Sequence, residues 1–362
     1  MSERTQMVTR PARVIGAERG VGRRRKRTRL HAVTVACLGA CIAAALWGVL
    51  AGSSSLTVGD VVRTLAGGGT RAQQLVVLDL RLPRVLVGLL VGASLGMAGA
   101  LTQTFARNPL ATPDILGVTS GAAFGGVAAI VLAGGSYVVG STLLGLGLPV
   151  VAALGGLATA TVVYGLSWRG GIDGYRLILI GIGATATLGG LTSYLLARAQ
   201  ITDAAAASQW LVGSLSSVSW SSVRPVLVVL VVIAPVALAQ SRHLELSRLG
   251  DEMSSGLGLN VQQHRLIVIV CAVLLTSVAV SASGPIDFVA FVAPQVARRL
   301  ARTGRPPLIA SALVGALIVT GGDALSRGVL PGEVPVGIVT TAVGAPYLIW
   351  LLTRRKEREA SS

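Results

Sequence analysis

The stretch RLPRVLVGLLVGASLGMAGALTQTFARNPLATPDILGVTSGAAFGG, residues 81–126, decides the fold class of this chain. Between Val85 and Ala106 it contains no Asp, Glu, Lys, Arg or His. This length suits a bilayer-spanning helix, which needs about 20 apolar residues. Glycines recur there at every fourth position, at Gly88, Gly92 and Gly96. They share one helix face, so we predict that a neighbouring helix packs closely against it.

The composition of the whole chain indicates a polytopic membrane protein. Of its 362 residues, 52% are hydrophobic and 13% are charged, and the mean hydropathy is +0.72. Soluble domains usually contain about 25% charged residues. Because lipid cannot hydrogen-bond exposed backbone groups, the apolar segments are expected to be helices. The predicted fold class is therefore an all-α polytopic membrane protein.

Charged residues and helix breakers divide the chain into apolar segments. There are ten of them: residues 32–51, 84–106, 114–134, 148–168, 176–197, 223–241, 264–283, 287–301, 306–326 and 335–352. The eighth is short and contains Pro294, which predicts a tilted or broken helix. No charge lies between Asp114 and Arg169, so the break between the third and fourth segments is placed near Gly134 and Pro149.

The distribution of basic residues predicts the orientation. Ten of the 31 Lys and Arg precede His31, and such a tail favours the anionic cytoplasmic face of a membrane over nucleic acid. With the N-terminus inside, 24 basic residues fall inside and 7 outside. We therefore expect an even number of spans, with both termini in the cytoplasm. The parts of the chain would be a basic tail (1–31), a transmembrane domain (32–352) and a C-terminal tail (353–362).

The spans lack the groups that catalysis or ion coupling usually needs. No ionisable residue lies in the middle of any span, whereas ion-coupled carriers usually need one there, although sodium carriers can use carbonyls and hydroxyls. The chain has no GxxxxGK[ST] phosphate loop, so any ATP hydrolysis belongs to another chain. Cys37, Cys41 and Cys271 have no histidine cluster beside them. We predict a non-enzymatic protein without a metal site or cofactor.

The longest predicted cytoplasmic connection is LELSRLGDEMSSGLGLNVQQHR, residues 244–265, which we name the coupling loop. Its pattern favours a short amphipathic helix closed by Gly256 and Gly258, and an ordinary polar loop is the alternative.

Two groups of polar residues lie at span ends. Arg81, Arg84 and Arg327 fall outside, against the positive-inside trend. They could anchor helix ends to lipid phosphates, or Arg327 could pair with Asp323 one turn away. The second group consists of Gln103, Asn108 with Pro109, and Gln295. Amides at such positions can bond across helices or line a wet passage.

Several motifs together resemble the FecCD/BtuC-type permeases of bacterial ABC importers for iron–siderophores and vitamin B12. They are RLPR (81–84), RNPLA (107–111), WLVGSLSSVSW (210–220), LGDE (249–252), SGPIDFVAF (283–291) and EVPVG (333–337). The segment GIDGYRLILIGIGA, residues 171–184, is similar to ferric enterobactin permease subunits. Gln295 replaces a histidine that is frequent in the family, Asp287 stands where a small residue is commoner, and Ser254 and Ser255 are also departures.

This resemblance implies a ten-helix type II ABC importer permease that carries a ferric siderophore across the bacterial cytoplasmic (inner) membrane. Its partners would be ABC ATPase subunits, an extracytoplasmic siderophore-binding (lipo)protein, a second permease subunit and membrane lipid. The three outer arginines would dock the binding protein. The coupling helix that enters the ATPase would contain Leu249, Gly250, Asp251, Glu252, Gly256, Leu257 and Gly258.

Rival interpretations are a vitamin B12 or haem permease of the same family, an ion-coupled secondary transporter of a small solute, and a membrane scaffold without transport. The motifs do not identify the chelate. They also do not decide between a homodimer and a heterodimer of permease subunits.

Overall fold

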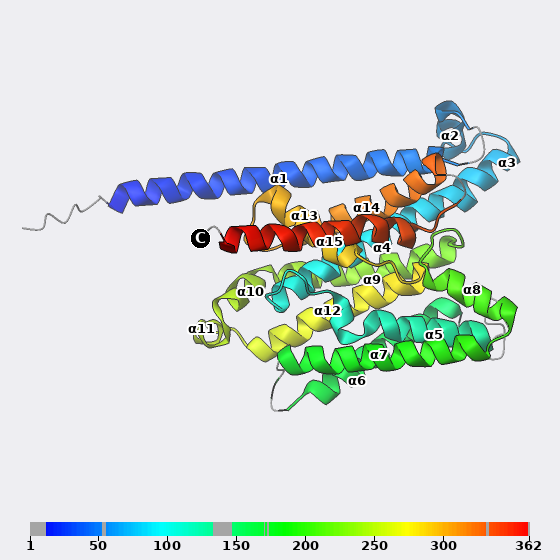
Figure 1. Cartoon of the computed structure of the whole chain (residues 1–362). Coiled ribbons are helices and arrows are strands. Elements are labelled where there is room, and N and C mark those ends of the chain that lie inside the picture. The colour runs from blue at the N-terminus through cyan, green and yellow to red at the C-terminus, as the bar shows by residue number, and fades with distance from the viewer. Residues whose placement is uncertain are drawn as a thin grey trace, which may run out of the picture.

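The computed structural model describes residues 12–52, 56–132, 147–169, 171, 174–330 and 333–360, and these ranges form helices without a β-strand. Each of the ten predicted apolar segments corresponds to a helix (Figure 1). The helices are α1 (Ala12–Leu50), α4 (Leu82–Phe105), α5 (Val118–Leu132), α6 (Leu148–Ser167), α7 (Gly174–Arg198), α9 (Trp220–Ala239), α12 (Val261–Ser283), α13 (Val289–Ala301), α14 (Leu308–Val329) and α15 (Val336–Ala360). The predicted break near Gly134 lies outside the described residues.

Shorter elements gather at the two ends of the bundle. One end, which we name the α2 end, carries α2 (Val58–Leu65), α3 (Arg71–Gln74) and α8 (Ile201–Leu211). The opposite α11 end carries α10 (Ser241–Leu246), the 3₁₀-helix η3 (Ser247–Leu249) and α11 (Asp251–Gly256). α1 begins and α15 ends at the α11 end (Figure 1), as an even number of crossings requires.

Three details differ from the sequence-based expectation or refine it. The helix that contains α4 begins at Arg71 rather than near residue 84, because Thr70 caps it and the π-helix η1 (Leu75–Arg81) continues it. α13 is short, as predicted, but it is unbroken at Pro294. α1 runs through the predicted boundary at residue 31 without a break.

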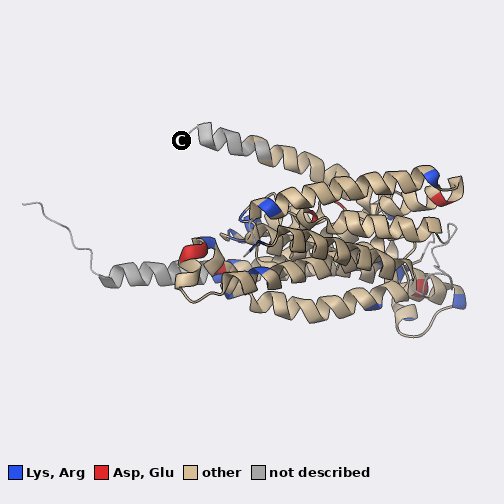
Figure 2. Ribbon diagram, turned by 90° about the horizontal axis from the view of Figure 1, so that it is seen from below, with Lys and Arg blue, Asp and Glu red and all other residues tan. Residues whose placement is uncertain are grey.

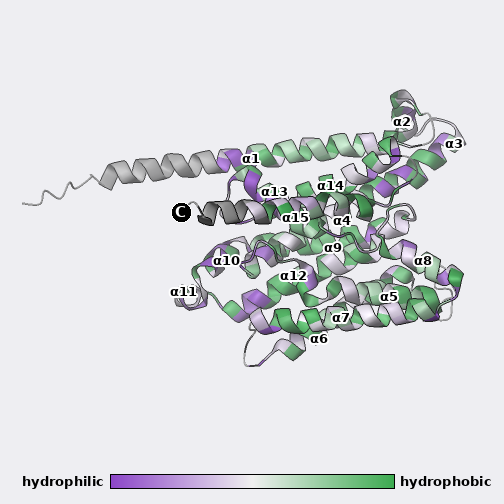
Figure 3. Ribbon diagram, viewed as in Figure 1, coloured by the Kyte–Doolittle hydropathy of each residue, from purple (hydrophilic) through white to green (hydrophobic). Residues whose placement is uncertain are grey.

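The central helices are buried and the outer ones are not. Seven described helices are long and apolar enough to cross a membrane. In the most apolar window of the helix Arg71–Phe105, 78% of the residues are buried, against 17% in α7 and in α9. Apolar residues recur along the lengths of the helices (Figure 3), and many large apolar side chains are exposed. Most charged residues lie near the two ends (Figure 2). This distribution fits a bundle surrounded by lipid, with wet ends.

α4 packs on α14 through backbone-to-backbone contact. A Cβ added at Gly92 would collide with the carbonyl oxygen of Gly315, and one at Gly96 would collide with that of Ser311. One at Gly88 would lie 3.1 Å from Thr320 Oγ1. The three glycines therefore lie along the contact between α4 and α14, where the absence of side chains lets two backbones meet.

Candidate functional site

At the α2 end, Arg81 closes the end of α1. Its Nη1 donates hydrogen bonds to the carbonyl oxygens of Val49, at 2.8 Å, and Leu50, at 3.0 Å. The last carbonyls of a helix have no partner within that helix and carry partial negative charge. The buried Arg81 side chain therefore ties the start of α4 to the end of α1.

Asp323 of α14 lies between two arginines from different parts of the chain. Its carboxylate is 2.9 Å from Arg84 Nη2 and 2.9 Å from Arg327 Nη2. Arg327 also donates to the carbonyls of Gly48 and Ala51, and Arg84 reaches the exposed Glu333 at 3.3 Å. The Asp323–Arg327 pair that the sequence offered as an alternative is thus formed. All three outer arginines hold α1, α4 and α14 together, and their role in docking a binding protein stays a prediction.

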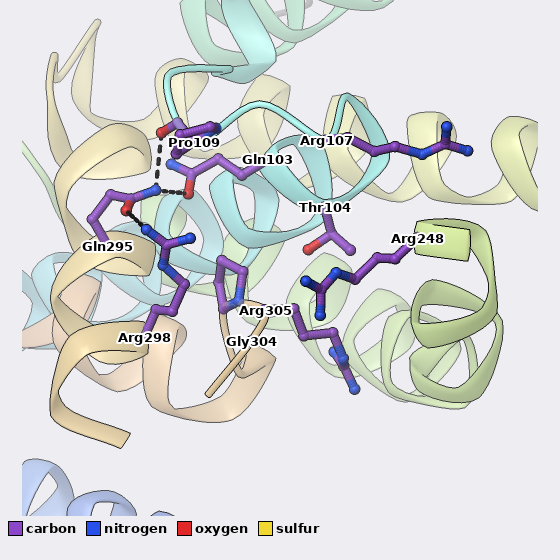
Figure 4. A pocket seen from close by; sticks show the side chains of 10 residues that line it. Gln103, Thr104, Arg107, Pro109, Arg248, Gln295, Arg298, Gly304 and Arg305 are labelled. Atoms are coloured by element: carbon purple, nitrogen blue, oxygen red, sulfur yellow. Dashed lines mark hydrogen bonds between the residues drawn. The ribbon is translucent and has the colours of Figure 1, made fainter. Parts of the chain in front are cut away.

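At the α11 end, the predicted amides form a cluster across α4 and α13 (Figure 4). The Nε2 of Gln295 donates to Gln103 Oε1 at 2.5 Å and to the Pro109 carbonyl at 2.9 Å. Gln103 in turn donates to the Phe291 carbonyl at 3.0 Å, and Arg298 donates to Gln295 Oε1 at 2.9 Å. Gln103 and Gln295 are buried, so this amide cluster bonds helices to each other.

Asn108 lies outside the amide cluster. Its Oδ1 accepts a hydrogen bond from the Leu110 backbone N–H at 2.9 Å, which shapes the turn after α4. The preceding Arg107 has a φ of +50°, in the left-handed region, and it ends the helix.

The coupling loop contains the end of α10, η3, the short helix α11, which ends at Gly256, and the start of α12. Gly250 and Gly258 have φ angles of +102° and +86°, which favour glycine. Ser254, a departure from the family pattern, is buried and donates to the Leu246 carbonyl at 2.8 Å, so it fastens α11 to α10.

Three apolar side chains project from this loop. Leu249, Met253 and Leu257 are each more than half exposed. Met253 and Leu257 are four residues apart and lie on one side of α11, whereas Leu249 precedes Gly250 at the end of η3. We name these three side chains the apolar knob. Gly256 and Leu257 end α11 beside Gly258, and no side chain crowds either glycine.

Asp251 connects the coupling loop to two long helices. Its carboxylate lies 2.6 Å from Arg107, after α4, and 2.5 Å from Arg265, near the start of α12. Partial burial raises the pKa of Asp251, but hydrogen bonds and charge from the two arginines outweigh it and leave the pKa below its usual range. The neighbouring Glu252 is exposed. A movement of α11 would thus pull on both helices through one carboxylate.

Sequence reasoning missed the contacts that join distant segments. Arg84 is 239 positions from Asp323, and Arg107 is 144 positions from Asp251. No local spacing marks such pairs. The sequence signals only that the motif arginines should pair with acidic residues. It does not indicate which acidic residue is the partner of which arginine.

The proteins to which this chain is similar are transport proteins. The chain matches the family model of the FecCD transport family over residues 38–354. It is 37% identical over 332 residues to the ferric enterobactin transport system permease protein FepG of Escherichia coli K12, covering 91% of this chain and 98% of that protein. It is also 37% identical over 290 residues to the iron(3+)-hydroxamate import system permease protein FhuG of Bacillus subtilis 168, covering 80% and 86%.

A solved structure described as an inward-facing conformation of a metal-chelate type ABC transporter has the same fold. Its TM-score is 0.78 at 29% identity, covering 89% of this chain and 99% of that one. The family model extends over most of the chain and includes both polar ends, the amide cluster and the α4–α14 contact. This protein is therefore a multi-pass membrane protein that belongs to the FecCD transport family.

Proposed function

We propose that this chain is a transmembrane permease subunit of an ABC importer that moves a ferric siderophore across the bacterial cytoplasmic membrane. The observation that carries the proposal is the coupling loop, where an exposed apolar knob is tied through Asp251 to the ends of α4 and α12. Exposed apolar side chains on a wet end of a membrane protein favour a protein partner. An ATPase at that place would transmit its closure into the bundle.

The distribution of basic residues gives the orientation of the bundle in the membrane. The α11 end would face the cytoplasm, with both termini on that side, because most basic residues fall there. ATP hydrolysis would belong to the partner chain, and the permease would supply two conformations of different stability.

The α2 end would receive the siderophore-binding protein. Arg81 and Arg327 are nearly enclosed, so a docking partner would meet the rim of their network at Arg84 and Glu333. An interface at this rim would use charge for register and association rate.

A second permease subunit would pack against α7. The outward face of α9 is rich in valine and leucine and suits lipid, with a mean hydropathy of 2.3 in its most apolar window against 1.5 for α7. On α7, Gly183, Gly189 and Gly190 have no atom within 4 Å of an added Cβ. A helix with an open glycine face suits close approach by another helix or the wall of a passage.

The relatives support a ferric siderophore as the substrate, since FepG and FhuG are named for ferric enterobactin and iron(3+)-hydroxamate. Vitamin B12 and haem are the alternatives within the family. An ion-coupled carrier is disfavoured because the one deeply buried carboxylate of α14, Asp323, is held by two arginines at the α2 end.

The ATPase contact can be tested by co-purification. Leu257→Glu should remove the ATPase from the purified transporter, because a charge would enter an apolar interface. Leu65→Glu is the matched control, since Leu65 is an equally exposed leucine on α2 at the opposite end. Retention of the ATPase by Leu257→Glu, at a level equal to the control, would contradict the assignment of the coupling loop.

A further inference from the structure

A cavity of about 360 Å³ lies between α4, α7 and α12 at the α11 end of the bundle. Residues from the end of α4, the start of α7 and the first half of α12 form its wall, together with Ile115 and Leu116 of the 3₁₀-helix η2 (Pro113–Leu116). Most of the residues in this wall are apolar. We name this space the apolar cavity.

The apolar cavity has an exposed mouth and a buried floor. Arg107 is exposed at the mouth, whereas Leu177 and Ile269 on the floor are 1% and 5% exposed. The hydroxyl group of Thr102, the one polar side chain on the floor among the described residues, already donates to the Ala98 carbonyl at 2.9 Å. A polar solute would lose its hydration on this floor without gaining hydrogen bonds, whereas apolar atoms have none to lose. The floor therefore selects an apolar ligand.

The floor of the apolar cavity lies deeper in the bundle than its mouth. Arg265, near the start of α12, and Ala272 both line the cavity, and Ala272 is 2% exposed. Because these two residues are seven positions apart, and a helix rises 1.5 Å per residue, the cavity extends about 10 Å along α12. It runs from the level of the charged residues toward the apolar part of the bundle. A phospholipid has its parts in the same order, with a polar head at the bilayer surface and hydrocarbon beneath.

On one side the apolar cavity borders α7, a helix with an exposed outer face. Only 17% of the residues in the most apolar window of α7 are buried, and Ile178 in the cavity wall is 36% exposed. Packed interiors have few voids larger than a water molecule, because the atoms around a void lose dispersion contacts. Around a membrane protein, the abundant apolar material that can fill such a space is the hydrocarbon of the bilayer.

From these observations we propose that the apolar cavity binds an acyl chain of a membrane phospholipid. An apolar cavity of about 150 Å³ is large enough for benzene, so this larger one has room for several carbons of an aliphatic chain. The bound chain also supports the coupling loop, because Arg107 and Arg265 in the cavity wall form the two ion pairs of Asp251. A filled cavity keeps α4 and α12 at the spacing that Asp251 bridges. The site does not depend on which solute the bundle transports.

The experiment uses the full-length chain in nanodiscs of phosphatidylcholine, in which a minor fraction of the lipid carries a photoreactive diazirine midway along one acyl chain. This lipid has no net charge, so labelling reports the position of the chain and not attraction to arginines. After illumination, the labelled residues are mapped by mass spectrometry. We expect label on Leu177 and Ile269, which bulk lipid cannot reach. Val231 on α9 is 60% exposed, contacts bulk lipid and serves as the internal standard.

Two variants fill the apolar cavity from different walls. Ala272→Phe fills the floor from α12, and Ile178→Trp fills the space from α7. Each should lower the ratio of floor label to Val231 label at least about tenfold, because a filled cavity has no room for a chain. Val270→Phe is the matched control, since Val270 also lies on α12 but is 44% exposed and outside the cavity wall. Its ratio should stay within about twofold of the wild-type ratio.

Thermal unfolding of each variant shows whether it is folded. Ile178→Trp guards against misfolding as an explanation, because Ile178 is partly exposed and a larger side chain there does not strain the buried floor. The proposal is overturned if Leu177 and Ile269 stay unlabelled in the wild type, or if the folded cavity-filling variants keep the wild-type ratio as Val270→Phe does.

Discussion

Replacing Gly92 by alanine tests the close backbone contact between α4 and α14. The new Cβ would lie 2.6 Å from the carbonyl carbon of Gly315 and 2.7 Å from the Cα of Ala316. Ordinary carbon–carbon contact needs roughly 3.5–4.0 Å, so α4 and α14 would have to separate by about 1 Å. Both obstructing groups are backbone atoms that no rotamer change can move away.

The expected cost follows from overpacking. Forcing one methyl group into a filled core typically costs about 1–3 kcal/mol, and separation also weakens the packing on which helix association in lipid depends. The better helix propensity of alanine returns at most about 1 kcal/mol. We therefore expect Gly92→Ala to be destabilised by roughly 1–2 kcal/mol after this offset. Gly92→Leu should fail to assemble.

The assay is reversible unfolding in mixed micelles, with the fraction folded followed against added sodium dodecyl sulfate. Gly39→Ala is the matched control, because Gly39 lies in α1 with no atom within 4 Å of an added Cβ. It should leave stability unchanged or raise it by up to about 1 kcal/mol, because alanine gains helix propensity there without a clash. Gly315→Ala opposes Gly92 from α14, so its cost should not add to that of Gly92→Ala. Equal stability of Gly92→Ala and Gly39→Ala would refute the backbone contact.

Three outcomes concern the charged groups. Asp323→Asn leaves the buried Arg84 and Arg327 without their carboxylate, so the free energy of unfolding should fall by about 3–5 kcal/mol. The yield of folded protein after purification measures this loss. Asp251→Asn should change stability by less than about 1 kcal/mol, because that ion pair is half exposed, yet it should lower transport-coupled ATPase activity. The pKa of Asp251 is lowered by folding, so its contribution is complete above the unfolded value of about 3.9 and is lost as the pH falls through the lower folded value. Unfolding curves of the wild type and Asp251→Asn should therefore converge only below about pH 4, and convergence between pH 5 and 8 would contradict the ion pairs.

The sequence predicts those features of the fold that depend on neighbouring residues, namely the helices and the glycine face of α4. Each apolar segment becomes a helix because lipid leaves its backbone no other partner, and fourfold glycine spacing marks the face where α4 meets α14. It does not predict that α4 continues a helix from Arg71, since Asp79 and Arg81 interrupt the apolar run although a π-turn accommodates them.

The candidate sites are formed by residues that lie far apart in the sequence. The coupling loop was recognisable from its glycines and its polarity, but the two arginines that hold Asp251 come from helices whose approach only packing determines.

The most direct test of the central claim is uptake of a radioactive ferric siderophore into proteoliposomes. The vesicles contain this chain with its ATPase and second permease subunit, and the binding protein is supplied on the side of the α2 end. The proposed function predicts accumulation that requires ATP, is stopped by vanadate, and disappears with Leu257→Glu but not with Leu65→Glu. Accumulation that proceeds without the ATPase and follows an imposed ion gradient would contradict it.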